Sequence, residues 1–356
     1  MRITEAVKRY SHEKLLICND ESSGLTAFIA IHDTTLGPAC GGVRIWPYER
    51  EEDAITDVLR LSRAMTYKSA AAGLSLGGGK GLIMADSHTE KTDRLLRAFG
   101  RCVESLGGRY VTTEDVGMKP EDLVVIAEET RHVVGLPTSH GGSGDTSPLT
   151  GLGVYMGMKA AAKSVWGSDS LEGRTVAMQG FGNVGTQTAH YLVKEGAKLI
   201  VADIYQQSRD KALGIGASVV APDDIYDVDC DIFSPCALGG TLNDETIPRL
   251  RSSIVAGGAN NQLLEEKHGE ALRTRGILYA PDYIINAGGI IQVACEIEGI
   301  CDPRKSKEMT ERIFDTTERV IKMSIDEDLP TSAAADRLAQ RRLDAARRQK
   351  SAVAAD

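Results

Sequence analysis

The sequence lacks several features that would place the protein outside the ordinary globular class. No segment of the 356 residues approaches the about 20 consecutive apolar residues that a membrane-spanning helix requires. The first residues, MRITEAVKRYSHEKLL, contain no apolar signal-peptide core, so we expect a cytoplasmic protein without a membrane partner. An excess of positive charge is also lacking. The net charge of −9 at pH 7 argues against a nucleic-acid partner.

Paired cysteines and metal-binding motifs are also lacking. The chain has seven cysteines, an odd number, and none belongs to a Cys-x-x-Cys pair. Reduced, mostly buried thiols fit this pattern better than a disulfide framework. The seven histidines are scattered along the chain. Cys230 and Cys236 flank an apolar strand, but the sequence shows no partners that would complete a tetrahedral zinc site there. We therefore expect no metal.

A complete phosphate-binding loop is missing, although the stretch GLSLGGGKGLIM at 73–84 resembles one at first sight. The motif requires a glycine five residues before the glycine that precedes the lysine, and a Ser or Thr after the lysine. Leu74 and Gly81 occupy those two positions, which disfavours a nucleotide-triphosphate site. Two interpretations of Lys80 stay open: a solvated charge beside a glycine turn, or a functional group at the edge of an apolar run.

What the chain does contain is the pattern of two α/β domains. Its length suits two domains, and 42% hydrophobic with 26% charged residues is typical of globular proteins. Strand and helix patterns alternate over about the first 135 residues. A segment rich in Gly, Ser, Thr and Pro follows at 136–153 and reads as a linker.

Beyond the linker the alternation resumes in the order of a doubly wound fold. Strands are expected at RTVAMQG, AKLIVAD, CDIFSPCA, SSIVAGGAN and GILYAPDYIINAGG, with three helices, one in each gap between the first four of these strands. A long helical region follows and breaks near Leu329-Pro330. Its basic end, DRLAQRRLDAARRQK, is expected to be an exposed or interface helix and not a nucleic-acid arm, given the acidic chain as a whole.

A dinucleotide-binding motif lies in this second region. Gly180, Gly182 and Gly185 form G-x-G-x-x-G between an apolar strand and a helix that starts near Asn183. The positive N-terminus of that helix can face a pyrophosphate. Asp203 ends the next strand, where a carboxylate can accept hydrogen bonds from both ribose hydroxyls and repels a 2′-phosphate. Since no basic residue follows before residue 209, we expect NAD as the cofactor.

The first region offers the groups that oxidation of an α-amino acid needs. Lys68 lies in a predicted helix, Lys80 lies in the glycine-rich stretch, and Asp115 lies at the end of a predicted strand. A lysine whose pKa is lowered by burial and by a second cation can act as a general base, while the charged cation binds a carboxylate. Hydride loss from an α-amino acid requires such a cation, a base that activates water and a further acid or base for the amine.

Several longer motifs are more specific than any single residue. They are IHDTTLGPACGGVR, LSRAMTYKSAAAGLSLGGGKG, GRYVTTEDVG, SPCALGG, AGGANNQL and YAPDYIINAGG. Together they resemble the Glu/Leu/Phe/Val family of amino-acid dehydrogenases, most of all its leucine dehydrogenase branch, over roughly residues 8–345. The resemblance implies a two-domain α/β enzyme with a catalytic cleft between its domains.

The domain limits follow from the same resemblance. It implies a substrate-binding and oligomerisation domain at 1–140, completed by C-terminal helices at 330–356, and a Rossmann NAD-binding domain at 141–329. The glycine-rich 140s would form the hinge. The resemblance also implies a homo-oligomer whose partners are small molecules: the amino acid or its 2-oxo acid, and ammonia.

The resemblance further implies roles for single residues of the first domain. Lys80 would be the general base that activates water, and Asp115 the proton shuttle to the amine. Lys68 would bind the substrate α-carboxylate with help from the backbone of Gly41 and Gly42.

In the second domain, Asn261 would contact the substrate amine, and Asn286 would border the nicotinamide and the substrate. The implied NAD-binding residues are Thr150, Gly180, Gly182, Asn183, Val184, Gly185, Asp203, Cys236 and Ala237.

The implied side-chain pocket departs from the leucine pattern. Cys40 replaces a leucine and enlarges the pocket, whereas Thr113 and Ile290 replace an alanine and a valine and shrink it; Val293 is retained. One methylene changes selectivity by only about 1–3 kcal/mol. No cation lies at these positions, so a glutamate side chain would be left unpaired. We expect leucine, valine or isoleucine; an aromatic substrate, or a non-catalytic NAD-binding regulator, stays open.

Overall fold

The computed structural model describes residues 3–300 and 302–353, which divide into two compact units. The first comprises the described residues of Met1–Asp145, Val293–Cys301 and Ala339–Asp356. The second comprises Thr146–Gln292 and Asp302–Leu338. This division places Val293–Cys301 in the first unit, whereas the predicted ranges placed that segment in the second.

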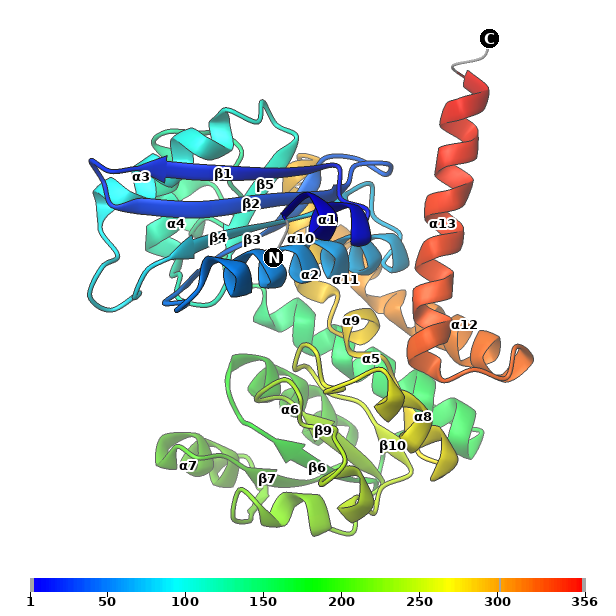
Figure 1. Cartoon of the computed structure of the whole chain (residues 1–356). Helices are drawn as coiled ribbons and strands as arrows, with labels where there is room; N and C mark the ends of the chain where they lie inside the picture. Colours follow the sequence, from blue (N-terminus) through cyan, green and yellow to red (C-terminus); the bar gives the residue numbers. More distant parts are fainter. Residues whose placement is uncertain (1–2, 301, 354–356) are drawn as a thin grey trace. The chain divides into compact units, whose positions relative to one another are not determined.

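A mixed five-stranded sheet forms the centre of the first unit (Figure 1). Its strands, in the order β1-β2-β4-β3-β5, are β1 Lys14–Asp20, β2 Leu25–Asp33, β4 Gly77–Met84, β3 Ala39–Trp46 and β5 Tyr110–Glu114. β1 and β2 pair antiparallel, as do β2 and β4, while β3 runs parallel to β4 and β5. The parallel strands carry the candidate catalytic residues.

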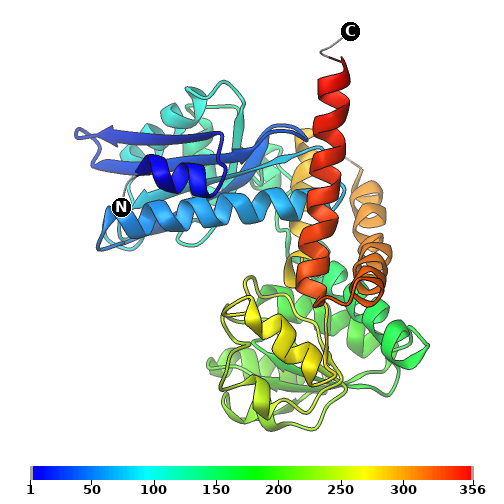
Figure 2. The same ribbon diagram turned by 45° about the vertical axis from the view of Figure 1, so that its right-hand side comes forward.

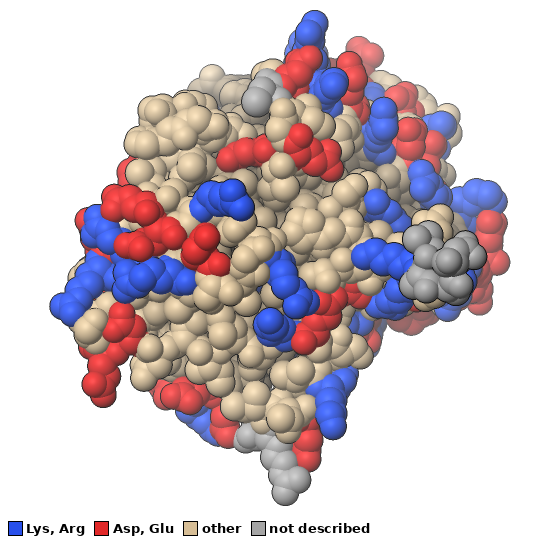
Figure 3. Space-filling view, turned by 90° about the horizontal axis from the view of Figure 1, so that it is seen from above, with Lys and Arg blue, Asp and Glu red and all other residues tan. Residues whose placement is uncertain are grey.

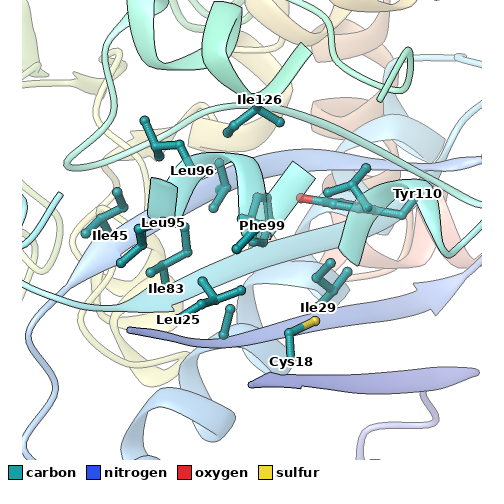
Figure 4. Close-up of a cluster of buried hydrophobic side chains, with 14 of the residues drawn as sticks. Cys18, Leu25, Ile29, Ile45, Ile83, Leu95, Leu96, Phe99, Tyr110 and Ile126 are labelled. Carbon is teal, nitrogen blue, oxygen red and sulfur yellow. The ribbon is translucent and has the colours of Figure 1, made fainter. Parts of the chain in front are cut away.

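Helices cover both faces of this sheet. They are α1 Ile3–Arg9, α2 Glu51–Ala71, α3 Asp93–Glu104 and α4 Pro120–Ala127. Successive strand residues point to opposite faces of the sheet. Phe28 and Ala30 of β2 therefore pack in a cluster with buried residues of α2. Ile29, between them, packs in a second cluster with Leu95 and Phe99 of α3 (Figure 4). Burial on both faces explains why the segment of β2 is almost continuously apolar.

The second unit contains a six-stranded parallel sheet in the order β11-β10-β9-β6-β7-β8. Its strands are β6 Thr175–Gln179, β7 Lys198–Ala202, β8 Ser218–Val219, β9 Ile232–Pro235, β10 Ile254–Val255 and β11 Leu278–Tyr279. Read from β8, this is the doubly wound dinucleotide-binding order, with its switch point between β6 and β9. The predicted α/β fold class is confirmed.

The helices of this unit frame the sheet, with one difference from expectation. They are α5 Ser147–Trp166, α6 Asn183–Glu195, α7 Gln206–Gly214, α8 Lys267–Thr274 and α9 Asp282–Ile285. The helix expected between β9 and β10 is a single 3-10 turn, η3 Ile247–Arg249. The side chain of Asn243 accepts hydrogen bonds from the backbone N–H groups of Glu245 and Thr246, at 2.9 and 3.0 Å. This local turn competes with a helix. The prediction was wrong here.

The C-terminal region is helical, as predicted. It contains α10 Gly288–Ile297, α11 Pro303–Glu311, α12 Ile313–Asp326 and α13 Thr331–Val353. α12 ends just before the predicted break at Leu329-Pro330, and α13 runs as one long helix (Figure 2). Arg342 donates to the carbonyl of Ala70 at 2.9 Å, and Arg347 pairs with Asp33 at 2.5 Å. The basic run therefore holds the part of α13 that starts at Ala339 against the other elements of the first unit, to which this part belongs.

The surface carries side chains of both charges. On the face shown in Figure 3, acidic and basic side chains are interspersed. In the part of the chain that the structure describes, no helix is both long and apolar enough to cross a membrane.

Candidate active site

Lys80 lies in the middle of a central strand. β4 begins at Gly77, so the glycines before Lys80 belong to the strand and the glycine-turn interpretation was wrong. A Cβ on Gly78 would lie 2.2 Å from the backbone nitrogen of Thr66 in α2, and one on Gly79 would lie 2.6 Å from the ring of Tyr110. The glycines are therefore explained by close packing against β4.

Lys80 forms an ion pair with Asp115, which directly follows β5. Its Nζ lies 2.7 Å from Oδ2 of Asp115, and the two side chains are 8% and 21% exposed. Burial alone would raise the pKa of Asp115, but the positive charges of Lys80 and Arg44 outweigh it and lower that pKa below its usual range. The structure thus brings together Lys80 and Asp115, which lie 35 positions apart in sequence. In this pair the carboxyl group of Asp115 stays ionised.

Arg44 is a third member of this cluster that sequence reasoning missed. Its Nε donates to Oδ2 of Asp115 at 3.1 Å, and its Nη1 donates to Oδ2 of Asp57 at 2.9 Å. The hydroxyl of Tyr48 donates to the same oxygen of Asp57. Arg44 follows the Gly41-Gly42 pair on β3, but no local pattern links it to a carboxylate on a distant strand.

Lys68 occupies the last turn of α2 and is half-buried. Thr66, two residues earlier, packs against Gly78, two residues before Lys80. The close packing of α2 on β4 therefore places both lysines on adjoining elements, each two residues from the contact. This supports the predicted pairing of their functions, which stays a prediction.

Gly41 and Gly42 lie on β3, between β4 and β5. A Cβ on Gly41 would lie 1.9 Å from the carbonyl oxygen of Gly79, and one on Gly42 would lie 2.2 Å from that of Glu114. Only glycine allows the chain to approach both neighbours so closely at these positions. The pair thus fixes β3 between the strands that carry Lys80 and lead to Asp115.

The predicted pocket residues are all shielded from solvent at least in part. Cys40 is fully buried, and desolvation raises the pKa of its thiol to about 12, so it is a neutral, small apolar group. Thr113 lies two residues along β5 from the partner of Cys40, with the Thr113 side chain beside Gly135. On α10, Ile290 and Val293 are 6% and 3% exposed.

Glu296, one turn after Val293, is a further residue that sequence reasoning missed. Its carboxylate accepts hydrogen bonds from the backbone N–H of Gly135 at 3.2 Å and from Oγ of Ser143 at 2.6 Å. A Cβ on Gly135 would lie 2.7 Å from Oγ1 of Thr113. Glu296 therefore holds the loop that contains Gly135 and Ser143, and this loop lies beside the pocket residue Thr113. A lone glutamate in a helix gave no signal in the sequence.

The glycine-rich turn after β6 lies at the switch point of the second sheet. Gly180 has a φ of +93°, and its Cβ would lie 2.7 Å from that of Ala237. The backbone N–H of Cys236 donates to the carbonyl of Gln179 at 2.7 Å. Two predicted cofactor segments, around Gly180 and at Cys236-Ala237, are therefore adjacent.

The start of α6 has room for a phosphate group. Gly182 precedes the first helical residue, Asn183, and no described atom lies within 4 Å of where its Cβ would be. The N–H groups of Asn183, Val184 and Gly185 belong to the first turn, whose dipole attracts an anion. A Cβ on Gly185 would meet the carbonyl of Gly180 at 2.7 Å, as expected for close helix–strand packing. These residues fit a dinucleotide pyrophosphate.

Asp203 organises the neighbouring loop. Its Oδ2 accepts from the backbone N–H of Phe181 at 2.7 Å, and its Oδ1 accepts from that of Tyr205 at 2.8 Å. Arg209, on α7, donates to the carbonyl of Asp203 at 2.7 Å. The carboxylate thus lies beside the glycine-rich turn, as the sequence predicts.

The other predicted residues of this unit differ in exposure. Asn286 is 3% exposed and donates to Oδ1 of Asn260 at 2.8 Å. Thr150 donates to the carbonyl of Thr146 at 2.9 Å, within α5. Asn261 is exposed with a φ of +52°. Their predicted contacts with substrate and cofactor stay predictions.

One group of side chains away from these residues has the chemistry of metal ligands: Asp244, Glu265 and His268. Lys267 already pairs with Asp244 at 2.7 Å and with Glu265 at 3.5 Å. The Nδ1 of His268 accepts from the backbone N–H of Glu265, which leaves its Nε2 protonated toward Asp244. This group is satisfied without an ion.

Comparison with known proteins agrees with this geometry. Residues 12–132 match the family described as Glu/Leu/Phe/Val dehydrogenase, dimerisation domain, and residues 141–206 and 201–350 match Glutamate/Leucine/Phenylalanine/Valine dehydrogenase. The leucine dehydrogenase of Bacillus subtilis (strain 168) is 53% identical over 99% of this chain and 96% of its own length. The L-tryptophan dehydrogenase of Nostoc punctiforme is 47% identical over 100% of both chains.

A solved structure extends the likeness to three dimensions. The crystal structure of L-tryptophan dehydrogenase from Nostoc punctiforme has a TM-score of 0.85 and 45% identity, and the match covers 97% of this chain and 99% of that one. The chain therefore belongs to the Glu/Leu/Phe/Val dehydrogenase family of NAD(P)-dependent amino-acid dehydrogenases.

Proposed function

We propose that the protein oxidatively deaminates an apolar L-amino acid, with NAD as the hydride acceptor, to the 2-oxo acid, ammonia and NADH. The observation that carries the proposal is the buried pair of Lys80 and Asp115 at 2.7 Å. A catalytically inactive regulator would have no need of a desolvated lysine held against an ionised carboxylate.

Each group has one role in the proposed reaction. Lys68 binds the α-carboxylate, and Asp115, kept ionised, takes a proton from the substrate ammonium. NAD, which the glycine-rich turn at Gly180 and the carboxylate of Asp203 would hold, would supply the acceptor for the hydride of the α-carbon, so that the substrate is oxidised to an iminium. Lys80, once it has lost its own proton to solvent, then takes a proton from a water molecule as that water adds to the iminium carbon. Asp115 returns its proton to the nitrogen, the carbon–nitrogen bond breaks as the added hydroxyl becomes the carbonyl, and the hydroxyl proton leaves with the nitrogen as ammonium. The net reaction consumes one water molecule and releases one proton.

The preference for NAD over NADP is supported by Asp203. Its carboxylate lies beside the first glycine-rich turn, where ribose hydroxyls can donate to it and a 2′-phosphate is repelled. Arg209 donates to the carbonyls of Asp203 and Ile204, so its guanidinium is held by the loop itself. Asp203→Asn is expected to narrow the difference in kcat/KM between NAD and NADP; equal efficiency of both cofactors in the unaltered protein would refute the preference.

Branched aliphatic substrates are favoured over aromatic ones. Thr113 and Ile290 narrow the predicted pocket, and the small Cys40 relieves this only in part. Leucine, valine and isoleucine are therefore expected to react faster than phenylalanine and tryptophan. The alternative, an aromatic substrate, is favoured by the enlargement at Cys40 and by the likeness to L-tryptophan dehydrogenase.

Assembly and location complete the proposal. The match to a dimerisation domain supports a homo-oligomer. The cytoplasmic location stays a prediction.

A panel of L-amino acids with NAD, followed by NADH absorbance, tests the proposal directly. Lys80→Ala is expected to lower kcat for the best substrate by about 10²–10⁴-fold, as loss of a general base does. NAD binding should be unchanged, because the cofactor residues belong to the other unit. Near-normal turnover of this variant would refute the mechanism, and no turnover of any amino acid by the unaltered protein would favour the regulator.

A further inference from the structure

Resting on the proposed function, we infer that Arg44 is a positioning residue for Asp115, held in place by Asp57 and Tyr48. It would keep the Asp115 carboxylate ionised and oriented for proton exchange with the amine. The inference concerns a residue that does not itself touch the substrate.

The geometry places Arg44 and Lys80 on the same face of the sheet. Arg44 is opposite Leu82 in the pairing of β3 with β4, and Lys80 lies two residues before Leu82. Strand residues two apart share a face. Both cations contact the same oxygen of Asp115, Lys80 at 2.7 Å and Arg44 at 3.1 Å. Asp115 is therefore held from two neighbouring strands.

Arg44 is itself held in place by Asp57, which Tyr48 contacts in turn. Its Nη1 contacts Asp57 of α2 at 2.9 Å, and the hydroxyl of Tyr48 donates to the same Asp57 oxygen. The side chains of Arg44 and Asp57 are 23% and 29% exposed, so this contact is partly desolvated. A planar guanidinium holds two carboxylates in fixed directions, whereas the ammonium group of a lysine is a point charge on a flexible stem.

The charges explain why a second cation is needed. Lys80 and Arg44 face Asp115 and Asp57, so the four charges cancel. As the proposed base, Lys80 must give up its positive charge during the reaction. Arg44 is always protonated, so it provides Asp115 with a permanent counter-charge throughout. Glu114 and Tyr110 of β5 also interact electrostatically with Asp115, and neither supplies a positive charge.

Arg44→Met tests the inference, with Arg101→Met as a matched control. Arg101 also pairs with an aspartate of the first unit, Asp20, at 3.3 Å, but away from Lys80. Two quantities are measured for each variant: the pH profile of kcat/KM for the best amino acid, and the titration of the Asp115 carboxylate. Infrared difference spectra against Asp115→Asn isolate that carboxylate, because the kinetic profile reports the coupled cluster.

Arg44→Met is expected to move the Asp115 titration and the acidic limb of the profile upward by about one pH unit or more, since a neighbouring Arg lowers the pKa of an Asp by about 1–3. Arg44→Lys should move both by less, and Arg101→Met should move neither. NAD affinity should be unchanged in all three variants. If Arg44→Met does not fold, Arg44→Lys decides by the same measurements.

An unchanged titration of Asp115 in the folded Arg44 variants would overturn the inference. Failure of the proposed function looks different: the unaltered protein would then oxidise none of the amino acids. In that case the infrared titration still shows whether Arg44 controls the ionisation of Asp115.

Discussion

Acid should destabilise the protein through two buried histidines of the first unit. His12 and His32 are 9% and 6% exposed, and their rings lie 4.8 Å apart. Nε2 of His12 lies 2.8 Å from Oγ of Ser62, and Nδ1 of His32 lies 2.8 Å from Oγ1 of Thr66. Desolvation lowers the pKa of both to about 4, from 6.5.

The groups around the pair do not offset this desolvation. The positive charge of Arg63 lowers both pKa values further, while the backbone carbonyls of Leu59 and Tyr10 raise that of His12 and Asp33 raises that of His32. The folded protein therefore keeps both rings neutral, whereas the unfolded chain binds protons as soon as the pH falls below 6.5.

The sign and size of the effect follow. Since the unfolded chain binds more protons between pH 6.5 and 4, the free energy of unfolding falls as the pH falls through that range. At about pH 5, each histidine should lower it by about 2 kcal/mol, from the two pKa values. Together they would lower it by about 4 kcal/mol, a large part of the about 5–15 kcal/mol that stabilises a typical domain.

Urea unfolding at about pH 7.5 and about pH 5 measures this difference. A double variant, His12→Gln with His32→Gln, removes both titrating rings and should lose about 4 kcal/mol less on acidification than the unaltered protein. His88→Gln, at an exposed histidine, should behave like the unaltered protein. An equal loss in the double variant would show that other groups cause the acid sensitivity.

Three further variants test other contacts. Lys68→Ala should raise KM for the amino acid more than it lowers kcat, measured by initial rates, because a carboxylate contact exists before and during hydride transfer. Gly78→Ala should lower the free energy of unfolding in urea by about 1–3 kcal/mol or more, since its Cβ would meet the Thr66 nitrogen at 2.2 Å. Gly180→Ala should weaken NAD binding, measured by fluorescence titration, by about 1–3 kcal/mol, since its φ of +93° and the nearby Ala237 both oppose a side chain.

Sequence patterns predicted those features best that depend on residues close together in the chain. The turn of Gly180, the start of α6 at Asn183 and the carboxylate of Asp203 all follow from one strand–helix–strand unit. Their spacing is set by local geometry, so a short motif is enough to place them. The alternation of strand and helix likewise predicted the α/β class of both units, because most of the strands are separated along the chain by helices that pack on the sheet.

Contacts between distant segments were not predictable in the same way. The pairing of Arg44 with Asp115, and of Glu296 with Gly135, joins residues from different elements. A single arginine or glutamate looks the same in sequence whether it faces solvent or a buried partner. The strand that carries Arg44 was missed as well, because β3 contains two glycines, which are unfavourable in strands except where another backbone approaches closely.

The two glycine-rich motifs of this chain look alike in sequence but exist for different physical reasons. Gly180 adopts a left-handed φ and turns the chain toward a helix N-terminus, where a phosphate can be bound. None of the described glycines from 77 to 81 has a positive φ; Gly78 instead lies where a Cβ would meet α2 at 2.2 Å. The motif at Gly180 leaves space for a ligand, and Gly78 in the other motif leaves space for helix α2. Because that helix lies directly on β4, Lys80 is held on a rigid central strand within 2.7 Å of Asp115, so the glycines serve the chemistry of the lysine by packing and not by binding phosphate.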